Sequence, residues 1–153
     1  MIILLENNFK ECNLIGTFNF DDIILEDRIN TNDDKLKLKK AGKCNVLVYS
    51  GEGPIPHFHI KGDNFETCIK IYSAEFFAHA DYHYELSKAN CEKLNEWLKQ
   101  DNILINPNET NWEVVKRMWK RNNPDSNYKN PSKECDEQPD YSKMENTKGK
   151  KVY

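Results

Sequence analysis

The sequence predicts an α+β fold: an antiparallel sheet of five or more strands, with two C-terminal helices packed on one face and an extended C-terminal tail. The first half of the chain holds short segments in which apolar and polar residues alternate, a pattern typical of strands with one buried face. Two amphipathic helical patterns follow, each behind an N-cap residue. We expect residues 1–121 to form one domain and residues 122–153 to form an extended or partly disordered tail, because this last segment is rich in proline and polar residues.

Three apolar segments in the first 30 residues, MIILL, GTFNF and DIIL, predict either several short strands or one strand with a loop. The segment KLKLK at 35–39 alternates with period two, which indicates a surface strand. We expect AGK at 41–43 to turn the chain. The next segment, CNVLVYS at 44–50, is rich in β-branched and aromatic residues, which favours a strand.

A hairpin is predicted after the turn segment GEGPIP. HFHIKG and FETCIKIYS meet at GDN, residues 62–64, which is a hairpin turn signal. In its second strand, alternation directs Cys68 and Glu66 away from the inward face. Residues 74–86 fit either a strand or a helix, and we favour the strand because Phe and Tyr dominate. The residues expected to face inward in the second strand are Phe65, Thr67, Ile69 and Ile71.

Two helices are predicted from their start signals. Ser87 is an N-cap candidate, and the apolar stripe behind it extends to about Gln100. Thr110 and Glu113 form a capping-box pattern, which predicts a second helix that ends near Arg121.

Composition excludes several classes of protein. The formal net charge is −3, which argues against a protein that binds polyanions over its whole surface. The N-terminus does not resemble a signal peptide, and no stretch reaches the length of a membrane span. The five cysteines form no C-x-x-C pair, so we expect reduced thiols and a cytoplasmic protein with no membrane partner.

The histidines are the residues most suggestive of chemistry. All four lie between positions 57 and 83, in the pairs His57/His59 and His79/His83. In a strand, His57 and His59 share one face, and in a helix His79 and His83 would also share one. The four side chains are candidate ligands for a divalent transition metal, Zn or Fe, with Asp81 or Glu66 completing the shell. The alternative is a polar, solvated sheet face with nothing bound. We expect the histidines at this face, beside the GEGPIP turn.

A second candidate site lies on the second helix. Its polar face is basic, and a partner, either RNA or an acidic protein, could bind there. A solvated face without a partner is the alternative. The candidate partner-binding residues are Lys116, Arg117, Lys120 and Arg121.

Four short motifs occur in a characteristic order: PHFHI at 56–60, YEL at 84–86, NEWL at 95–98 and NWE at 111–113. Over about residues 44–120, the chain resembles the small bacterial proteins of domain-of-unknown-function family 4160. The turn departs from the family pattern, because GEGPI stands where the family often has another histidine. The resemblance implies a hairpin fold and a role in a toxin–antitoxin or defence-type module.

Two functions follow from these features. The first is a small bacterial or phage protein that acts mainly by binding a macromolecular partner. The second is a histidine-dependent, metal-dependent hydrolase or ribonuclease-like toxin, in which His57 and His59 are ligands or catalytic acid–base groups. We prefer the first, because the sequence contains no serine nucleophile elbow, no phosphate-binding glycine loop and no complete catalytic set.

Overall fold

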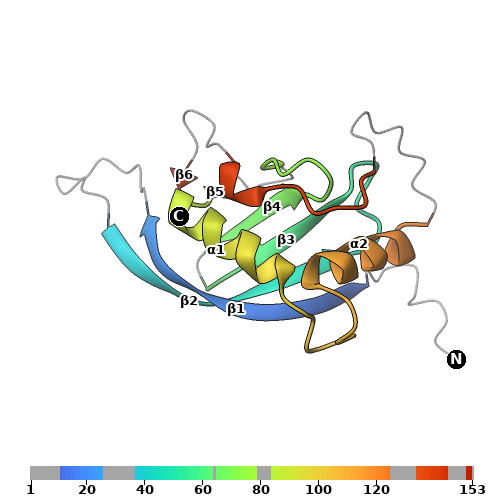
Figure 1. Ribbon diagram of the computed structural model, residues 1–153. Helices are drawn as coiled ribbons and strands as arrows, with labels where there is room; N and C mark the ends of the chain where they lie inside the picture. The colour runs from blue at the N-terminus through green and yellow to red at the C-terminus, as the bar shows by residue number, and fades with distance from the viewer. Residues whose placement is uncertain are drawn as a thin grey trace, which may run out of the picture.

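The computed structural model describes residues 11–25, 37–63, 65–78, 84–124, 134–144 and 151–152, with side chains omitted at 21–25, 37–41, 84 and 151–152. The predicted α+β class is confirmed. Four antiparallel strands form one sheet in the order β1-β2-β3-β4 (Figure 1). Their bounds are Cys12–Leu25 for β1, Lys37–Tyr49 for β2, His57–Lys61 for β3 and Glu66–Lys70 for β4.

The expectation of five or more strands in this sheet is wrong for the described residues. The segments GTFNF and DIIL lie together in one long strand, β1, whereas MIILL lies outside the described residues. The chain turns after β4, and Ala74 takes a left-handed φ of 41°. Only an isolated bridge between Phe76 and Ile69 then returns to the sheet. The short strand β5 (Tyr84–Glu85) instead pairs in parallel with β6 (Lys151–Val152), and this pair contacts β4 and β1 of the main sheet.

The turn expected at 41–43 is also wrong, because β2 continues through it. Gly42 pairs with Phe20 of β1 while adopting a φ of +68°. This left-handed conformation is readily available to glycine, so the strand accommodates it without breaking. The long β1–β2 ribbon therefore curves beneath the rest of the molecule (Figure 1).

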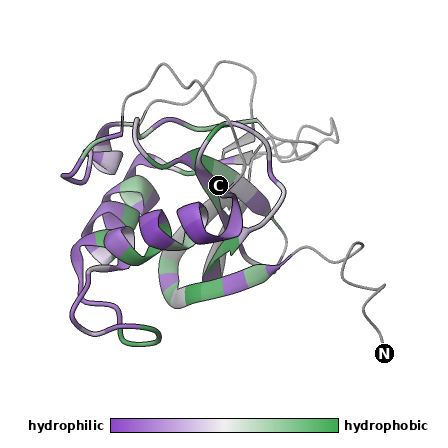
Figure 2. Ribbon diagram, turned by 90° about the vertical axis from the view of Figure 1, so that its right-hand side faces the viewer, coloured by the Kyte–Doolittle hydropathy of each residue, from purple (hydrophilic) through white to green (hydrophobic). Residues whose placement is uncertain are grey.

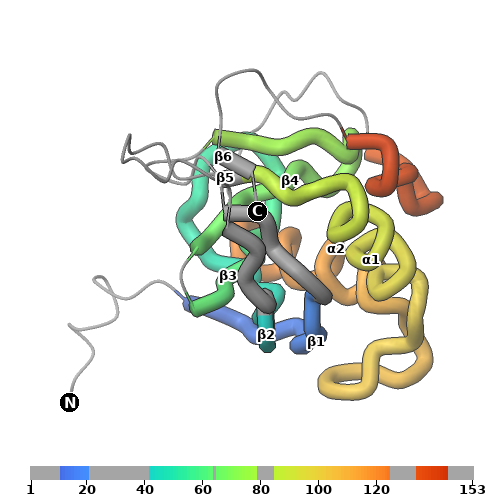
Figure 3. Tube along the Cα trace, turned by 90° about the vertical axis from the view of Figure 1, so that its left-hand side faces the viewer, coloured from blue at the N-terminus to red at the C-terminus, as the bar shows by residue number. Residues whose placement is uncertain are grey.

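Both helices begin where their caps predict. The helix α1 (Lys88–Lys99) has Ser87 as N-cap, and the Ser87 side chain accepts a hydrogen bond from the Asn90 N–H. The helix α2 (Asn111–Asn122) starts with a complete capping box between Thr110 and Glu113. The two helices lie on the same side of the sheet, as predicted (Figure 1). Figure 3 shows α1 and α2 next to each other beside the strands of that sheet. None of the described helices is long and apolar enough to span a bilayer.

The main core lies between the sheet and these helices. Phe58 pairs with Ile69 across β3 and β4, and Ile60 pairs with Val46 across β3 and β2. Directly opposed residues share one face of a sheet, and all four side chains are fully buried. Hydrophobic and hydrophilic residues alternate around the helices and along the strands (Figure 2). The inward residues predicted for β4 and its flanks are confirmed as buried: Phe65, Thr67, Ile69 and Ile71.

The C-terminal segment contributes to the same core. A short 3-10 helix, η2 (Tyr141–Lys143), packs against α1, and the Tyr141 ring is fully buried. The Tyr141 hydroxyl donates to the Ile71 carbonyl at 2.5 Å and accepts from Trp112 Nε1 at 3.1 Å. Tyr141 therefore anchors residues 134–144 to the body of the domain.

Candidate functional site

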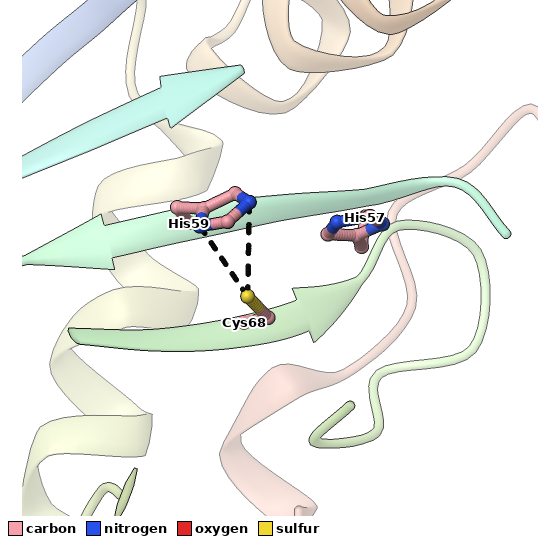
Figure 4. Close-up of side chains that lie close together, drawn as sticks. All are labelled: His57, His59 and Cys68. Atoms are coloured by element: carbon pink, nitrogen blue, oxygen red, sulfur yellow. Dashed lines mark hydrogen bonds between the residues drawn. The ribbon is translucent and has the colours of Figure 1, made fainter. Parts of the chain in front are cut away.

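The candidate site lies on the β3–β4 hairpin. His57 and His59 are two residues apart on β3, so both side chains lie on the same face of the sheet. Cys68 of β4 lies directly opposite His59. Figure 4 shows the three side chains gathered between the two strands. Candidate ligand atoms of these three residues all lie within 4.8 Å of one another. The prediction that His57 and His59 point the same way is confirmed.

The expected solvated face is wrong, because these side chains are buried. His57 is 1% exposed, His59 is 2% exposed, and Cys68, which was expected to face outward, is fully buried. Aromatic rings from three other segments cover the imidazoles. Trp119 of α2 and Phe77 lie 5.2 and 4.8 Å from the His57 ring, and Tyr49 of β2 lies 4.6 Å from the His59 ring.

Glu52, in the turn between β2 and β3, joins the two imidazoles. Its Oε1 atom lies 2.8 Å from His57 Nε2 and 2.6 Å from His59 Nε2. The Nδ1 atom of each ring contacts an oxygen atom of another residue, not Glu52. His57 Nδ1 lies 2.7 Å from the Ile55 carbonyl, and His59 Nδ1 lies 3.0 Å from Glu66 Oε2. Each imidazole is therefore held between two oxygen atoms.

If both imidazoles donate from Nδ1, this arrangement requires positive charge between the rings. A backbone carbonyl only accepts hydrogen bonds, so His57 must donate from Nδ1. If His59 likewise donates from Nδ1 to an ionised Glu66, neutral forms of both imidazoles present bare Nε2 lone pairs. Both lone pairs then point at an oxygen of Glu52. Three acceptor atoms converging in a buried site repel one another unless protons or a cation bind between them.

The ionisation of the acidic and basic groups follows the same logic. Burial alone would raise the pKa of Glu52, but hydrogen bonds from His57 and His59 hold that pKa well below its usual range. Burial alone would lower the pKa of His59, but its hydrogen bonds with Cys68, Glu52 and Glu66 raise it to about 11. The cluster thus stabilises a positive charge next to the Glu52 carboxylate.

Cys68 adds a soft ligand to this cluster. Its Sγ lies 3.4 Å from His59 Nδ1 and 3.7 Å from His59 Nε2 (Figure 4). Because the Cys68 sulfur is almost equally distant from both nitrogens of His59, its contact is shared between the two nitrogens. Burial, which has the largest effect, raises the pKa of the Cys68 thiol, and the hydrogen bond with His59 opposes that rise. A bound cation would favour the thiolate in the same way.

His57, His59 and Cys68 offer donor atoms that lie close enough together to hold a metal ion. Bond lengths of about 2.0–2.3 Å around tetrahedral Zn²⁺ place neighbouring ligand atoms roughly 3.3–3.8 Å apart. The separation of 3.7 Å between Cys68 Sγ and His59 Nε2 already matches this spacing. The two contacts of Glu52 Oε1, at 2.8 and 2.6 Å, are shorter and would have to lengthen. Imidazole, thiolate and carboxylate together are ligands that zinc accepts.

The sequence identified only part of this set. It singled out His57 and His59, and Glu66 as an accessory residue, and the structure brings these three together. His79, His83 and Asp81 lie outside the described residues. The sequence analysis singled out neither Glu52 nor Cys68 as a candidate site residue. The hairpin register could have indicated Cys68, because a turn at 62–65 places it opposite His59, but no local pattern distinguishes Glu52 from other turn carboxylates.

The basic face of α2 carries internal contacts. Arg117 forms an ion pair with Glu109 at 2.6 Å, and Lys120 forms one with Glu134 at 3.0 Å. Lys116 Nζ lies 4.4 Å from the Trp112 ring centroid, and Arg121 donates to Met118 Sδ at 3.7 Å. These contacts occupy part of the cationic surface. A partner, whether RNA or protein, at Lys116, Arg117, Lys120 and Arg121 stays a prediction.

A separate apolar patch consists of Leu14, Ile103 and Leu104, which are 39%, 94% and 55% exposed. The three side chains line one groove beside Trp97. The Asn102 side chain holds the loop that carries Ile103, since it donates to the Ile15 carbonyl at 2.8 Å and accepts from the Asn106 N–H at 3.0 Å. This apolar patch is therefore fixed in place rather than presented on a loosely held loop.

Comparison with known proteins adds no relative: the chain matches no protein-family model, no curated protein and no solved structure.

Proposed function

We propose that this protein binds one divalent transition metal ion, Zn²⁺ in the first instance, through Glu52, His57, His59 and Cys68. The observation that carries the proposal is the convergence of both Nε2 atoms on Glu52 Oε1, while both Nδ1 atoms face oxygen atoms elsewhere. A metal-binding histidine characteristically donates a hydrogen bond from its second ring nitrogen to a carboxylate or a backbone carbonyl. Glu66 and the Ile55 carbonyl would have these two roles. A cytoplasmic location is part of the proposal, because Cys68 has to be reduced to bind.

The metal site is proposed to be structural rather than catalytic. Structural zinc sites have four protein ligands, whereas catalytic sites keep one position open for water or substrate. Here four side chains supply four ligands, and the residues that carry them are all less than 9% exposed. His57 and His59 would then be ligands, with no part in acid–base catalysis. This supports a binding protein over the hydrolase or ribonuclease alternative.

Elemental analysis tests the proposal directly. Protein purified under reducing conditions, incubated with Zn²⁺ and desalted is expected to retain one zinc ion per chain. Cys68→Ser is expected to lower retention well below one, because a hydroxyl is a much poorer zinc ligand than a thiolate. Cys91→Ser is the matched control, since Cys91 is also buried at 1% exposure but is not among the proposed ligands.

His79 and His83, which the sequence analysis named as candidate ligands and which lie outside the described residues, provide a further arm of this experiment. The double variant His79→Ala/His83→Ala is expected to retain its zinc ion, because the proposed set already has four ligands. Loss of zinc in this variant would show that the set is wrong. Equal retention of zinc in wild type and in Cys68→Ser, or no retention in wild type, would contradict the proposal. Glu52 and the two imidazoles would then be joined by hydrogen bonds alone, with no metal ion.

We also propose that the folded domain acts by binding a protein partner, in line with the toxin–antitoxin or defence context that the resemblance to domain-of-unknown-function family 4160 implies. The apolar patch favours this second role. An isoleucine that is 94% exposed on a hydrogen-bonded loop is pre-organised to enter a partner's pocket, which lowers the entropy cost of binding. Exposed apolar clusters of this kind are typical of interaction surfaces.

A photo-crosslinking residue at position 103 should identify this partner in the producing cell. We expect one dominant crosslinked species from position 103 and none of it from position 108, an exposed control site on the same loop. In a binding assay with the purified partner, Ile103→Asp should weaken affinity at least tenfold, about 1.4 kcal/mol. Identical crosslinks from both positions, or unchanged affinity of Ile103→Asp, would rule out the patch as the binding surface.

A further inference from the structure

We infer that Asn123, at the C-terminal end of α2, is a positioning residue that aims Glu52 into the metal site, so that metal affinity and the order of the last turn of α2 depend on each other. This inference rests on the proposed metal site. It concerns two residues 71 positions apart in the sequence, which one buried hydrogen bond joins.

Glu52 differs from the other proposed ligands in the element that carries it. His57, His59 and Cys68 stand on paired strands, whose register fixes their side chains. Glu52 lies in a turn, between Gly51 and Gly53, which adopt φ values of +65° and +87°. Glycine is the most conformationally permissive residue, so the local backbone alone does little to fix the direction of Glu52.

One contact that holds this turn comes from α2. The backbone N–H of Glu52 donates to Asn123 Oδ1 at 3.1 Å. The Asn123 amide is itself fixed, because its Nδ2 donates to the carbonyls of Tyr49 at 3.0 Å and Trp119 at 3.1 Å. A flipped amide would place an oxygen against both carbonyls, so this orientation is the one that satisfies all three contacts.

Asn123 is also the C-cap of α2, and its backbone N–H donates to the Trp119 carbonyl. Trp119 in turn packs against the His57 ring at 5.2 Å. The end of α2 thus contacts the metal site twice, through the Glu52 backbone and through an imidazole ring. Because coupling between two equilibria is reciprocal, an ion that fixes Glu52 should also stabilise the last turn of α2.

Zinc affinity measured by competition with a chromophoric chelator tests the positioning role. Asn123→Ala is expected to weaken Zn²⁺ binding about 10- to 100-fold while the stoichiometry stays at one, as is typical for residues that orient a ligand. Asn122→Ala is the matched control. Asn122 is buried to the same degree and bonds to Asn13 and the Val48 carbonyl, with no hydrogen bond to the turn of Glu52 among the contacts described.

A double-mutant cycle separates positioning from general loosening of the fold. In a Glu52→Gln background, Asn123→Ala should cause little further loss of affinity, because the residue it positions is already impaired. If Asn123→Ala weakens zinc binding no more than Asn122→Ala does, or weakens it equally in both backgrounds, the inference is wrong. Failure of the wild-type chain to bind zinc would instead refute the metal site itself, so the two failures are distinguishable.

Hydrogen exchange on the wild-type chain gives a second test that needs no variant. Zinc should slow exchange at the Glu52 amide and at the amides of residues 119–123, and Asn123→Ala should remove the effect on α2. The control is α1, whose protection should rise only by the gain in global stability that zinc gives the whole fold. Zinc binding at one ion per chain with no more added protection at residues 119–123 than in α1 would overturn the inference and leave the metal site standing.

Discussion

Tyr141→Ala is expected to lower the free energy of unfolding by about 3–5 kcal/mol, the range found when a large buried aromatic side chain is removed. The Tyr141 ring is fully buried and lies 6.0 Å from the Phe58 ring in an edge-to-face arrangement. Removing it leaves a cavity between α1 and the sheet, and it also removes the hydroxyl that bonds to the Ile71 carbonyl. Urea denaturation followed by far-UV circular dichroism measures the change.

Tyr141→Phe is the matched control, because it keeps the ring and removes only the hydroxyl. We expect a smaller loss, about 1–2 kcal/mol, since Trp112 Nε1 also contacts the Ile71 carbonyl at 3.2 Å. If Tyr141→Ala costs less than about 0.5 kcal/mol, which is the range of surface substitutions, then residues 134–144 do not belong to the cooperative core. A loss in Tyr141→Phe equal to that in Tyr141→Ala would mean that the hydroxyl matters and the ring does not.

Local patterns in the sequence predicted the elements of this fold better than their arrangement. The caps at Ser87 and Thr110 depend on side chains within three residues, so both helix starts were correct. The number of strands in the sheet was wrong because pairing depends on partners distant in sequence. Residues 74–86 have strand-like composition, yet β5 pairs with residues 151–152, a partner that no local pattern indicates.

For the candidate site, too, local patterns were predictable from the sequence and contacts between distant segments were not. Period-two alternation correctly placed His57 and His59 on one face. Their burial was not predictable, because Trp119 and Phe77, which cover His57, come from other segments. Glu52 was missed for a similar reason. Its role depends on how the turn is held by Asn123, a contact that no sequence periodicity reveals.

The distinction between a structural and a catalytic ion depends on Glu52. With Glu52 bound, an ion in the proposed site would have four protein ligands and no open position for water or substrate. If Glu52 moved away, His57, His59 and Cys68 would form a three-ligand site with one open position, which is the arrangement of many catalytic zinc ions. The hydrogen bond from the Glu52 backbone to Asn123 opposes this movement. The proposed structural ion and the catalytic alternative would thus differ in the position of one turn.

Zinc is expected to stabilise the wild-type chain by about 4 kcal/mol when free Zn²⁺ exceeds the dissociation constant 1,000-fold. For one site in the folded state alone, unfolding free energy rises by about 1.4 kcal/mol per tenfold increase in free Zn²⁺ above the dissociation constant. Denaturation curves at buffered zinc concentrations measure this slope, which does not require the affinity to be known. Cys91→Ser should show the same slope, and Cys68→Ser should show little slope at concentrations that saturate wild type. A flat response of the wild-type chain would mean that protons alone balance Glu52 and the two imidazoles.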